Sequence, residues 1–336
     1  MSKRILVFFL LLLLPFPATA ADTPHFIFPA ACTYGKTCWA VNYVDVDPAK
    51  NAVKDFTCNI KTYDAHKGTD FALGSVKQMR AGVDVLAAAN GTVLRLRDGE
   101  SDTLKTPEEF ENIRKNTKEC GNGVLIDHGN GLETIYCHLK KGSIVVKPHE
   151  KVTTGQKIAQ IGQSGLAEFP HLHFGVMDAG KIIDPYTGVS NEDGCGKMKD
   201  PLWADPKTMT YEPVAIFNGG FRTEKPDFNA IQRGDDPNPA TLSLNSQAFV
   251  FWGGFFNVEK GDDITLSIVD PDGKLFNTRR ETIPKTRARQ YYFTGRKIGD
   301  VQLKPGIYKG IVTLTRKVEG GADIARSREF TVKVTP

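Results

Sequence analysis

Short runs of β-branched and aromatic residues, each ended by Gly, Asn, Asp or Pro, fill most of this 336-residue chain. Such runs are typical of strands, and the residues that separate them are typical of tight turns. Clear examples are GTVLRL, GVLIDHGNGLETIYCHL and FGVMDAGKIIDP. The second example is predicted to be a hairpin, with GNGL as its turn. We therefore expect a mostly β fold built from antiparallel sheets.

One helix interrupts this pattern, at TPEEFENIRKN. Thr106 is a natural N-cap, Pro107 suits the first helical position, and Glu109 completes a capping box. The helix lies in a polar insertion over residues 98–122, between two strand patterns. Insertions of this kind usually lie on the surface, and some of them border binding clefts.

The character of the chain changes after DPLWADP. From about Val214 onward there are no histidines or cysteines, and strand-like runs such as AFVFWGG and GIYKGIVTLTR recur. This spacing predicts a β-sandwich of immunoglobulin-like architecture. A group of basic residues lies between two of its strands, and we assign it to a solvated loop in preference to an anion-binding patch. The group consists of Arg279, Arg280, Lys285, Arg287 and Arg289.

The first residues, MSKRILVFFLLLLLPFPATAAD, have the pattern of a secretory signal peptide: a basic start, an apolar core and small residues before the cut. We expect residues 1–20 to be removed, followed by a first domain over 21–212 and a second, accessory domain over 213–336. No cysteine lies at the cut, and no later run is long and apolar enough for a membrane span. The expected location is therefore the periplasm or the exterior of the cell.

The charge of the chain is close to balanced, with 43 basic and 39 acidic residues. Removal of Lys3 and Arg4 with the signal peptide leaves 41 basic residues, or an excess of about two. This balance argues neither for nor against binding to polyanions. We assign no nucleic-acid partner and expect a monomer.

Six cysteines follow the signal peptide, and an even number in an exported protein favours three disulfides. No C-x-x-C pair occurs, which argues against a zinc finger. Six cysteines allow fifteen pairings, so connectivity is open. Cys32 and Cys38 would close a short loop, and Cys120 and Cys137 would join the two strands of a hairpin. Cys58 and Cys195 then remain as the third favoured pair.

The stretch FPHLHFGV places two histidines one residue apart in an apolar run that has the pattern of a buried strand. Side chains alternate between the faces of a strand, so His171 and His173 share one face while Leu172 and Phe174 occupy the other. The two imidazoles therefore face one space. Either they are two half-buried structural histidines, or they belong to a metal or catalytic site.

A second stretch, DAHKGTDFAL, places His66 and Asp70 four positions apart. Imidazole and carboxylate are ordinary zinc ligands, and one histidine of the HLH pair would bring the protein ligands to three. Three ligands and one open position are the pattern of a catalytic zinc site. A third stretch, IYCHL, supplies His138 near the end of a hairpin strand; taken alone, this histidine would be assigned a structural role.

Together, HKGTDFA, YCHL and HLHF resemble, in this order and separation, the motifs of the lysostaphin-type zinc endopeptidases, also called the LytM or glycyl-glycine endopeptidase family. The resemblance covers about residues 55–190 and includes the GVDVLAAANGTVLRL strand and the central hairpin. The chain departs from the family pattern in having Cys137 where a small residue is usual, Gly175 where an acidic residue often follows, no Ser-x-Gly before HLH, and a large insertion.

The resemblance implies a peptidase domain of antiparallel β-sheet with His66, Asp70 and His173 as zinc ligands. It implies that His138 and His171 do not bind zinc but serve catalysis. The substrate would be a peptidoglycan peptide, cut at an amide bond in a stem peptide or a cross-link. His128, next to the GNGL turn, is assigned a structural role.

Two other functions are compatible with such a chain. One is a catalytically inactive protein of the same fold that activates other wall hydrolases, which would be marked by loss of a metal ligand. The other is an adhesive wall-binding protein whose C-terminal sandwich carries the function. All expected ligands are present in the sequence, which favours the enzyme.

Overall fold

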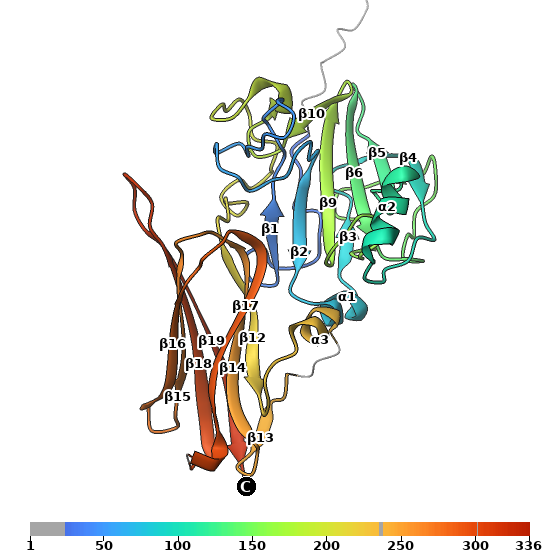
Figure 1. Ribbon diagram of the computed structural model, residues 1–336. Helices are drawn as coiled ribbons and strands as arrows, with labels where there is room; N and C mark the ends of the chain where they lie inside the picture. The colour runs from blue at the N-terminus through green and yellow to red at the C-terminus, as the bar shows by residue number, and fades with distance from the viewer. Residues whose placement is uncertain (1–23, 235–237, 301) are drawn as a thin grey trace, which may run out of the picture.

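The computed structural model describes residues 24–234, 238–300 and 302–336 (Figure 1). Two β-rich parts follow each other along the chain, an antiparallel sheet and then a pair of smaller sheets. The predicted mostly β, antiparallel fold is confirmed. The predicted signal peptide lies outside the described residues. The division between residues 212 and 213 falls in the link before the second part and stays a prediction.

The first part is organised around one twisted sheet in which all neighbouring strands are antiparallel. Its strands lie in the order β1 (Cys38–Asn42), β2 (Thr69–Leu73), β9 (His171–Asp178), β6 (Leu132–Leu139), β5 (Asn122–Asp127), β4 (Gly91–Arg97) and β7 (Lys151–Val152). The edge of β9 is extended by β10 (Lys181–Asp184) and β11 (Val189–Ser190), and β3 (Asp84–Leu86) pairs separately with β8 (Lys157–Gln160).

One face of this sheet carries the hydrophobic core of the first part. Phe71, Tyr136 and Phe174 come from β2, β6 and β9, are fully buried, and point to the same side. Trp203 packs on Phe71 and Phe174 from the segment that follows the sheet. The opposite face of the same strands is therefore available for polar side chains.

Helices contribute little to the core. α1 (Val76–Ala81) follows β2, and α2 (Pro107–Lys115) buries no residue. The predicted capping box of α2 is present, since the Thr106 hydroxyl accepts from the Glu109 amide while the Glu109 carboxylate accepts from the Thr106 amide. α3 (Phe228–Arg233) and the short 3₁₀ turns Asn191–Asp193 and Ile298–Asp300 complete the set. Among the described residues, no helix has the length and apolar character needed to cross a bilayer.

Three disulfides join the six cysteines, in the pairs that the sequence favoured. They link Cys32 to Cys38, Cys58 to Cys195, and Cys120 to Cys137. The third bond ties the end of the polar insertion to β6, directly beside His138. The second spans 137 positions and ties the loop before β2 to the segment after β11.

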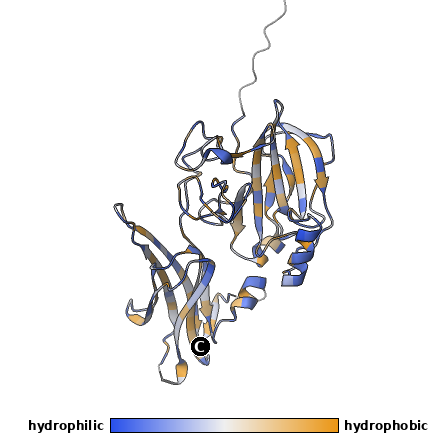
Figure 2. Ribbon diagram, turned by 45° about the horizontal axis from the view of Figure 1, so that its top comes forward, coloured by the Kyte–Doolittle hydropathy of each residue, from blue (hydrophilic) through white to orange (hydrophobic). Residues whose placement is uncertain are grey.

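The second part is a sandwich of two sheets. Strands β12 (Ala215–Arg222), β14 (Ala248–Val258) and β17 (Arg287–Lys297) form one sheet, and β13 (Thr241–Ser243), β19 (Ile324–Thr335), β18 (Gly306–Arg316), β15 (Asp263–Val269) and β16 (Leu275–Thr282) form the other. Phe251 and Phe255 pack with Leu266 and Leu314 between them. Hydrophobic residues recur along the strands of both parts (Figure 2). The immunoglobulin-like class of this sandwich stays a prediction.

The assignment of the basic run to a solvated loop is wrong for most of its residues. Arg279 and Arg280 lie in β16, and Arg287 and Arg289 lie in β17. The run was misassigned because charged residues alternate with others along strands that have one solvated face. Arg279 is paired with Glu281 at 3.0 Å, so part of this charge is neutralised within the sheet.

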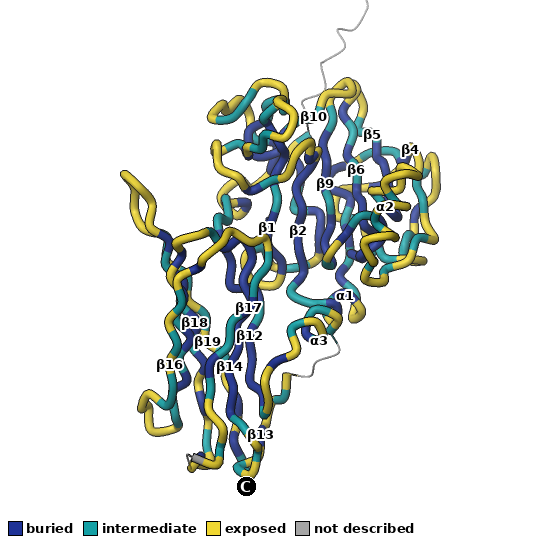
Figure 3. Tube along the Cα trace, viewed as in Figure 1, coloured by how far each residue is buried: buried dark blue, intermediate teal, exposed yellow. Residues whose placement is uncertain are grey.

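A hydrophobic cluster joins the two parts. Trp39 and Val41 from β1 pack with Phe217 of β12 and with Trp252 and Phe256 of β14, and all five side chains are buried. Figure 3 shows buried residues along the strands of both parts and exposed residues on the surrounding loops. Apolar burial of this kind is the principal force that holds two such surfaces together.

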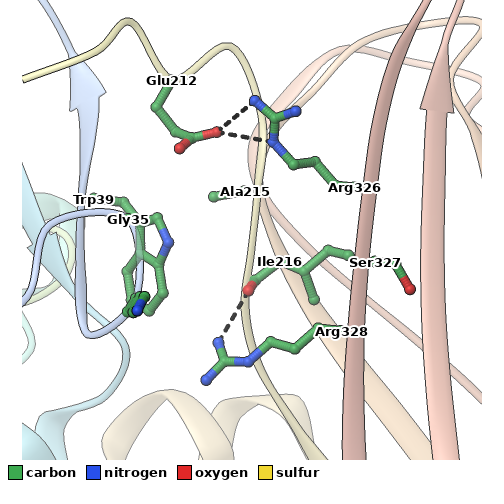
Figure 4. A pocket seen from close by; sticks show the side chains of 9 residues that line it. Gly35, Trp39, Glu212, Ala215, Ile216, Arg326, Ser327 and Arg328 are labelled. Carbon is green, nitrogen blue, oxygen red and sulfur yellow. Dashed lines mark hydrogen bonds and ion pairs between the residues drawn. The ribbon is translucent and has the colours of Figure 1, made fainter. Parts of the chain in front are cut away.

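Polar contacts fix the same junction. The buried Lys61 ammonium lies 2.8 Å from the Glu259 carboxylate and donates to the Asn257 carbonyl at 3.0 Å. Arg326 also pairs with Glu212 at 3.0 Å, and the Arg328 guanidinium lies 5.9 Å from the centre of the Trp39 ring, beside a hollow of about 410 Å³ (Figure 4). The sandwich is thus held in a defined position against the first sheet.

Candidate metal centre and active site

Strands β2 and β9 bring the two main motifs together across the sheet. Asp70 lies opposite His173, and Phe71 lies opposite Leu172. Because side chains alternate along both strands, Phe71 and Leu172 enter the core while Asp70 and His173 point to the other face. His171 lies two positions before His173 and shares that face, as the sequence predicts.

Three donor atoms converge there. The Asp70 Oδ1 atom lies 2.9 Å from His173 Nδ1 and 3.1 Å from His66 Nε2, and the two imidazole nitrogens are 3.1 Å apart. His66 and Asp70 are each 2% exposed. The structure therefore places the three residues expected as ligands in one compact cluster that could hold a metal ion.

His66 is positioned by the loop before β2. Its Nδ1–H donates to the Tyr43 carbonyl at 2.6 Å, and the Tyr63 ring stacks on the imidazole with centroids 4.2 Å apart. Gly68 lets the loop approach β9, since a Cβ there would lie 2.6 Å from the Phe174 carbonyl and 2.7 Å from His173 Nε2. The HKGTD motif therefore requires glycine at its centre for a steric reason.

The chemistry of these atoms fits a cation. With the Nδ1–H of His66 committed to a carbonyl, its Nε2 presents a lone pair to the Asp70 carboxylate, and two acceptors so close repel unless a proton or metal ion lies between them. Asn42 donates to Asp70 Oδ2 at 2.9 Å, which leaves Oδ1 for the cluster. A tetrahedral zinc with bonds of about 2.0–2.2 Å separates its ligand atoms by roughly 3.3–3.6 Å, close to the spacing here.

Burial and mutual charge set the protonation states of the cluster. Burial acts to raise the pKa of Asp70, but the charges of His66 and His171 and hydrogen bonds from His173 and His66 outweigh it and hold that pKa well below its usual range. Burial lowers the pKa of His173 and, more strongly, that of His138, where His171 and His173 add to the effect. A charged carboxylate and neutral imidazoles are the forms that bind metal.

His138 reaches the site through a β-bulge. In a regular strand it would share the face of Tyr136 and enter the core, but the pairing of β5 with β6 shifts between Asn122 and Val124. His138 has a φ of 60°, a conformation rare for residues other than glycine. Its amide donates to the Cys120 carbonyl at 2.8 Å, so the disulfide-linked insertion holds the bulge.

The two histidines outside the cluster are oriented in the same way. His138 Nδ1 donates to the Ser164 carbonyl and His171 Nδ1 to the Phe169 carbonyl, both at 2.8 Å. Their rings lie 4.5 Å apart, and His171 Nε2 is 3.7 Å from Asp70 Oδ1. Each Nδ1 is thus engaged as a donor, which leaves the Nε2 atoms available for a reacting group.

Two hollows flank the cluster, of about 580 and 380 Å³. Both are lined by Tyr63, Leu166 and Arg114, the last from α2 of the insertion. Phe110 of α2 and Ala288 of β17 line the smaller hollow. The insertion therefore borders the cleft, and the sandwich reaches it as well.

The remaining histidines lie elsewhere. Both ring nitrogens of His128 are hydrogen-bonded. Nδ1 lies 2.7 Å from the Asn90 carbonyl, and Nε2 lies 2.8 Å from the Thr134 hydroxyl. Burial lowers its pKa. His25 and His149 are exposed. These contacts give His128 the structural role that its position beside a turn predicts.

Several residues at the site carry no signal in the sequence. Asn42 and Tyr63 act on the ligands from neighbouring segments, and Ser164 and Phe169 act through backbone carbonyls, which any residue type supplies. Tyr63 directly precedes the stretch DAHKGTDFAL and Phe169 begins FPHLHFGV, but neither position shows its role from the motif alone. Pairing across the sheet brings these groups together, and no local pattern encodes it.

The region that holds this site is similar to known proteins. Residues 64–185 match the model of peptidase family M23. An uncharacterised metalloprotease of Haemophilus influenzae is 33% identical over 122 residues, which cover 36% of this chain and 20% of that protein. The peptidoglycan DD-endopeptidase ShyA of Vibrio cholerae is 34% identical over 119 residues, which cover 35% of this chain and 22% of ShyA.

A solved structure of a zinc-containing peptidase from Vibrio cholerae is 28% identical to this chain, with a TM-score of 0.28, and the match covers 43% of this chain and 39% of that one. The chain spans only about a fifth of the length of the two curated relatives above. The matched region nevertheless includes all five residues of the histidine and aspartate cluster and its neighbours. Residues 64–185 therefore belong to peptidase family M23.

Proposed function

We propose that this chain is an exported, zinc-dependent endopeptidase that hydrolyses amide bonds in peptidoglycan stem peptides or cross-links. The observation that carries the proposal is the convergence of His66, Asp70 and His173 beside two further histidines whose Nε2 atoms are free to act. Membership of residues 64–185 in family M23 supports the same function, as does the similarity to ShyA, a peptidoglycan DD-endopeptidase.

His66 Nε2, Asp70 Oδ1 and His173 Nδ1 would hold the zinc. Zinc bound in such a site acidifies water and polarises a carbonyl group. Asn42, Tyr43 and Tyr63 keep the ligand atoms oriented, in the way that outer contacts commonly tune a metal site. The charge on Asp70 is secured by its depressed pKa.

His138 and His171 would handle the proton and the developing charge. With Nδ1–H donated to a carbonyl, a neutral imidazole has its lone pair on Nε2, which accepts a proton from the attacking water. The protonated ring then stabilises the tetrahedral oxyanion or delivers the proton to the leaving amine. Both Nδ1 atoms face backbone carbonyls, and the 4.5 Å between the two ring centres would let both histidines serve one reacting peptide bond.

The hollows on either side of the cluster suit an extended peptide that crosses the site. Arg114 and Tyr63 line both hollows, so they are placed at the point where the scissile bond would lie. An extended peptide spans about 3.3 Å per residue, so a few residues on each side fill a cleft of this size. The three disulfides favour an oxidising compartment, which agrees with action in the periplasm or outside the cell.

The test is digestion of purified peptidoglycan by the mature chain, followed by mass analysis of the soluble fragments. Zinc-loaded protein is expected to release peptides with new amino and carboxyl ends, a chelator to stop release, and added zinc to restore it. His66→Ala is the matched inactive control. Intact peptidoglycan after treatment with the zinc-loaded protein would contradict the enzyme and favour the inactive activator or wall-binding alternative.

A further inference from the structure

The C-terminal sandwich packs against Phe169, which stands two residues before His171. The Phe169 ring lies between the His171 imidazole, at 5.1 Å, and the Phe256 ring of β14, at 5.7 Å. The guanidinium of Arg289, in β17, lies 5.1 Å from the Phe169 centroid. Residues from two parts of the chain thus enclose the residue whose carbonyl orients His171.

Arg289 differs from its neighbours in the same strand. Arg287 and Ala288 are exposed, whereas Arg289 is half-buried and donates to the Gln232 side chain of α3 at 2.9 Å. A guanidinium held in this way over an aromatic face restrains the ring through cation–π attraction and packing. Its place is therefore defined by contacts from both the helix and the aromatic ring.

The residues on either side of Phe169 restrain its backbone to different degrees. Pro170 follows it and has no N–H to donate, but its carbonyl accepts from the Leu73 amide at 3.0 Å and ties the chain to β2. Glu168, on the other side, is exposed. The ring contacts of Phe169 therefore add a second anchor for the carbonyl that holds His171 Nδ1, beside the backbone hydrogen bond at Pro170.

We propose that Arg289 and Phe256 of the sandwich are positioning residues for His171, acting through Phe169. This inference rests on the proposed function for the catalytic part of His171. The sandwich then does more than extend the molecule: by holding Phe169 it keeps the His171 imidazole in the tautomer and orientation that present Nε2 to the reacting group.

The first test compares Arg289→Met with the matched control Arg287→Met, from an exposed position of the same strand. Arg289→Met is expected to keep one zinc per chain and its KM while kcat falls about tenfold, because His171 loses its orientation and acid–base catalysis contributes about a hundredfold or more. Arg289→Lys, which keeps the cation, should recover part of that loss. Equal kcat in Arg289→Met and Arg287→Met would overturn the proposal.

The second test needs no activity. In metal-free, ¹⁵N-labelled protein, the two ring nitrogens of His171, assigned with a His171→Gln spectrum, report which nitrogen carries the proton. The wild type should show one tautomer protonated at Nδ1, and Arg289→Met a mixture. A single unchanged tautomer in Arg289→Met would overturn the positioning role, whereas failure of the wild type to digest peptidoglycan would count against the proposed function alone.

A double-variant cycle tests the route through Phe169. Phe169→Ala should reproduce the loss of kcat seen in Arg289→Met, and the double variant should lose little more, since both changes release the same carbonyl. Losses that multiply would contradict this route. The unfolding temperature of each variant shows whether a loss of kcat is due to unfolding. If Arg289→Met unfolds, Phe256→Leu replaces it as the test of the contact with Phe169.

Discussion

At the residue scale, the site shows which positions a local pattern can specify. Strand alternation correctly predicts that His171 and His173 share a face, and the family resemblance correctly implies that His66 and Asp70 lie beside His173. The orientation of His138 could not be predicted in this way, because a regular strand would direct it into the core with Tyr136. The bulge that redirects it depends on pairing with β5.

Ligand and non-ligand residues should separate in their effects on metal binding. His66→Ala, Asp70→Ala and His173→Ala are expected to lose zinc and activity together, because each removes one of three converging donors. His138→Ala and His171→Ala should keep zinc and lose about 10²–10⁴ in kcat, with the double variant little worse than either single one. Elemental analysis beside kcat provides the check. Zinc retained in His173→Ala but lost in His171→Ala would reverse the assignment within HLH.

Asn42 should control zinc affinity without touching the metal. Its side-chain amide holds Asp70 Oδ2, so Asn42→Ala frees the carboxylate to rotate, and the loss of such a contact typically costs about 10–100-fold in metal affinity. Competition with a fluorescent chelator measures this affinity. Asn245→Ala, in an exposed turn of the sandwich, is the control. Equal affinities in the two variants would show that Asp70 needs no such support.

Asp184 should make stability depend on pH. Burial raises the pKa of this carboxyl to about 7, and its Oδ2 has no hydrogen-bond partner in the described part of the chain. The unfolded chain releases this proton near its ordinary pKa, so the wild type loses stability as pH rises from about 4 to 7 and no further above that. Each pKa unit corresponds to about 1.4 kcal/mol, hence a loss on the order of 4 kcal/mol.

Asp184→Asn keeps an acceptor for the Tyr186 amide and removes the charge. We expect the variant to be more stable than the wild type at pH 8 and similar to it at pH 4, as measured by urea unfolding across pH. If the free energies of unfolding of the two proteins changed by the same amount between pH 4 and pH 8, Asp184 would not be a buried group that ionises in this range.

At the element scale, the helix of the insertion was predictable and its role was not. Thr106, Pro107 and Glu109 encode the start of α2 locally. Nothing local places Phe110 and Arg114 at the cleft, because that depends on how the insertion folds back on β6. The misassigned basic run shows the same limit, since its strands are fixed by pairing with β15 and β14.

The disulfide between Cys120 and Cys137 should support catalysis as well as folding. It closes a loop over 17 positions beside the His138 bulge, and a loop of that size contributes about 3 kcal/mol. Replacing both cysteines by Ala should lower the free energy of unfolding by that order and reduce kcat while zinc stays bound. Replacing Cys32 and Cys38, which close a short loop elsewhere, is the control for kcat. An unchanged kcat in the first variant would show that the backbone alone holds the bulge.

At the scale of the whole molecule, the sequence predicts two β-rich parts but does not predict which of their surfaces are in contact. The run AFVFWGGFFNV in β14 has apolar residues on both faces, which is typical of a strand buried on both sides. Its partner strand β1 has the same character, since Cys38 and Ala40 pack in the core of the first part while Trp39 and Val41 face the sandwich. Which surface covers which therefore emerges only from the folded chain.

A chain that ends at Glu212 tests this junction. The cluster of His66, Asp70 and His173 and the core of the first part lie before that residue, so the shortened chain is expected to fold and bind one zinc. Its unfolding temperature should fall by several degrees, because Trp39 and Val41 become exposed, and its kcat should fall at least tenfold, because Phe169 loses its contacts. Calorimetry and digestion assays measure the two effects. Full activity in the shortened chain would mean that the sandwich is dispensable.

The shared hydrophobic cluster also restricts how this protein can have changed in evolution. Accessory modules joined by loose linkers are readily exchanged between genes, but here an exchange would leave Trp39 facing a foreign surface. Homologues that keep the sandwich should therefore vary in concert at Trp39, Phe217 and Phe256, and homologues that lack it should have polar residues at the first of these positions. The catalytic region and its sandwich are thus expected to be inherited as one unit.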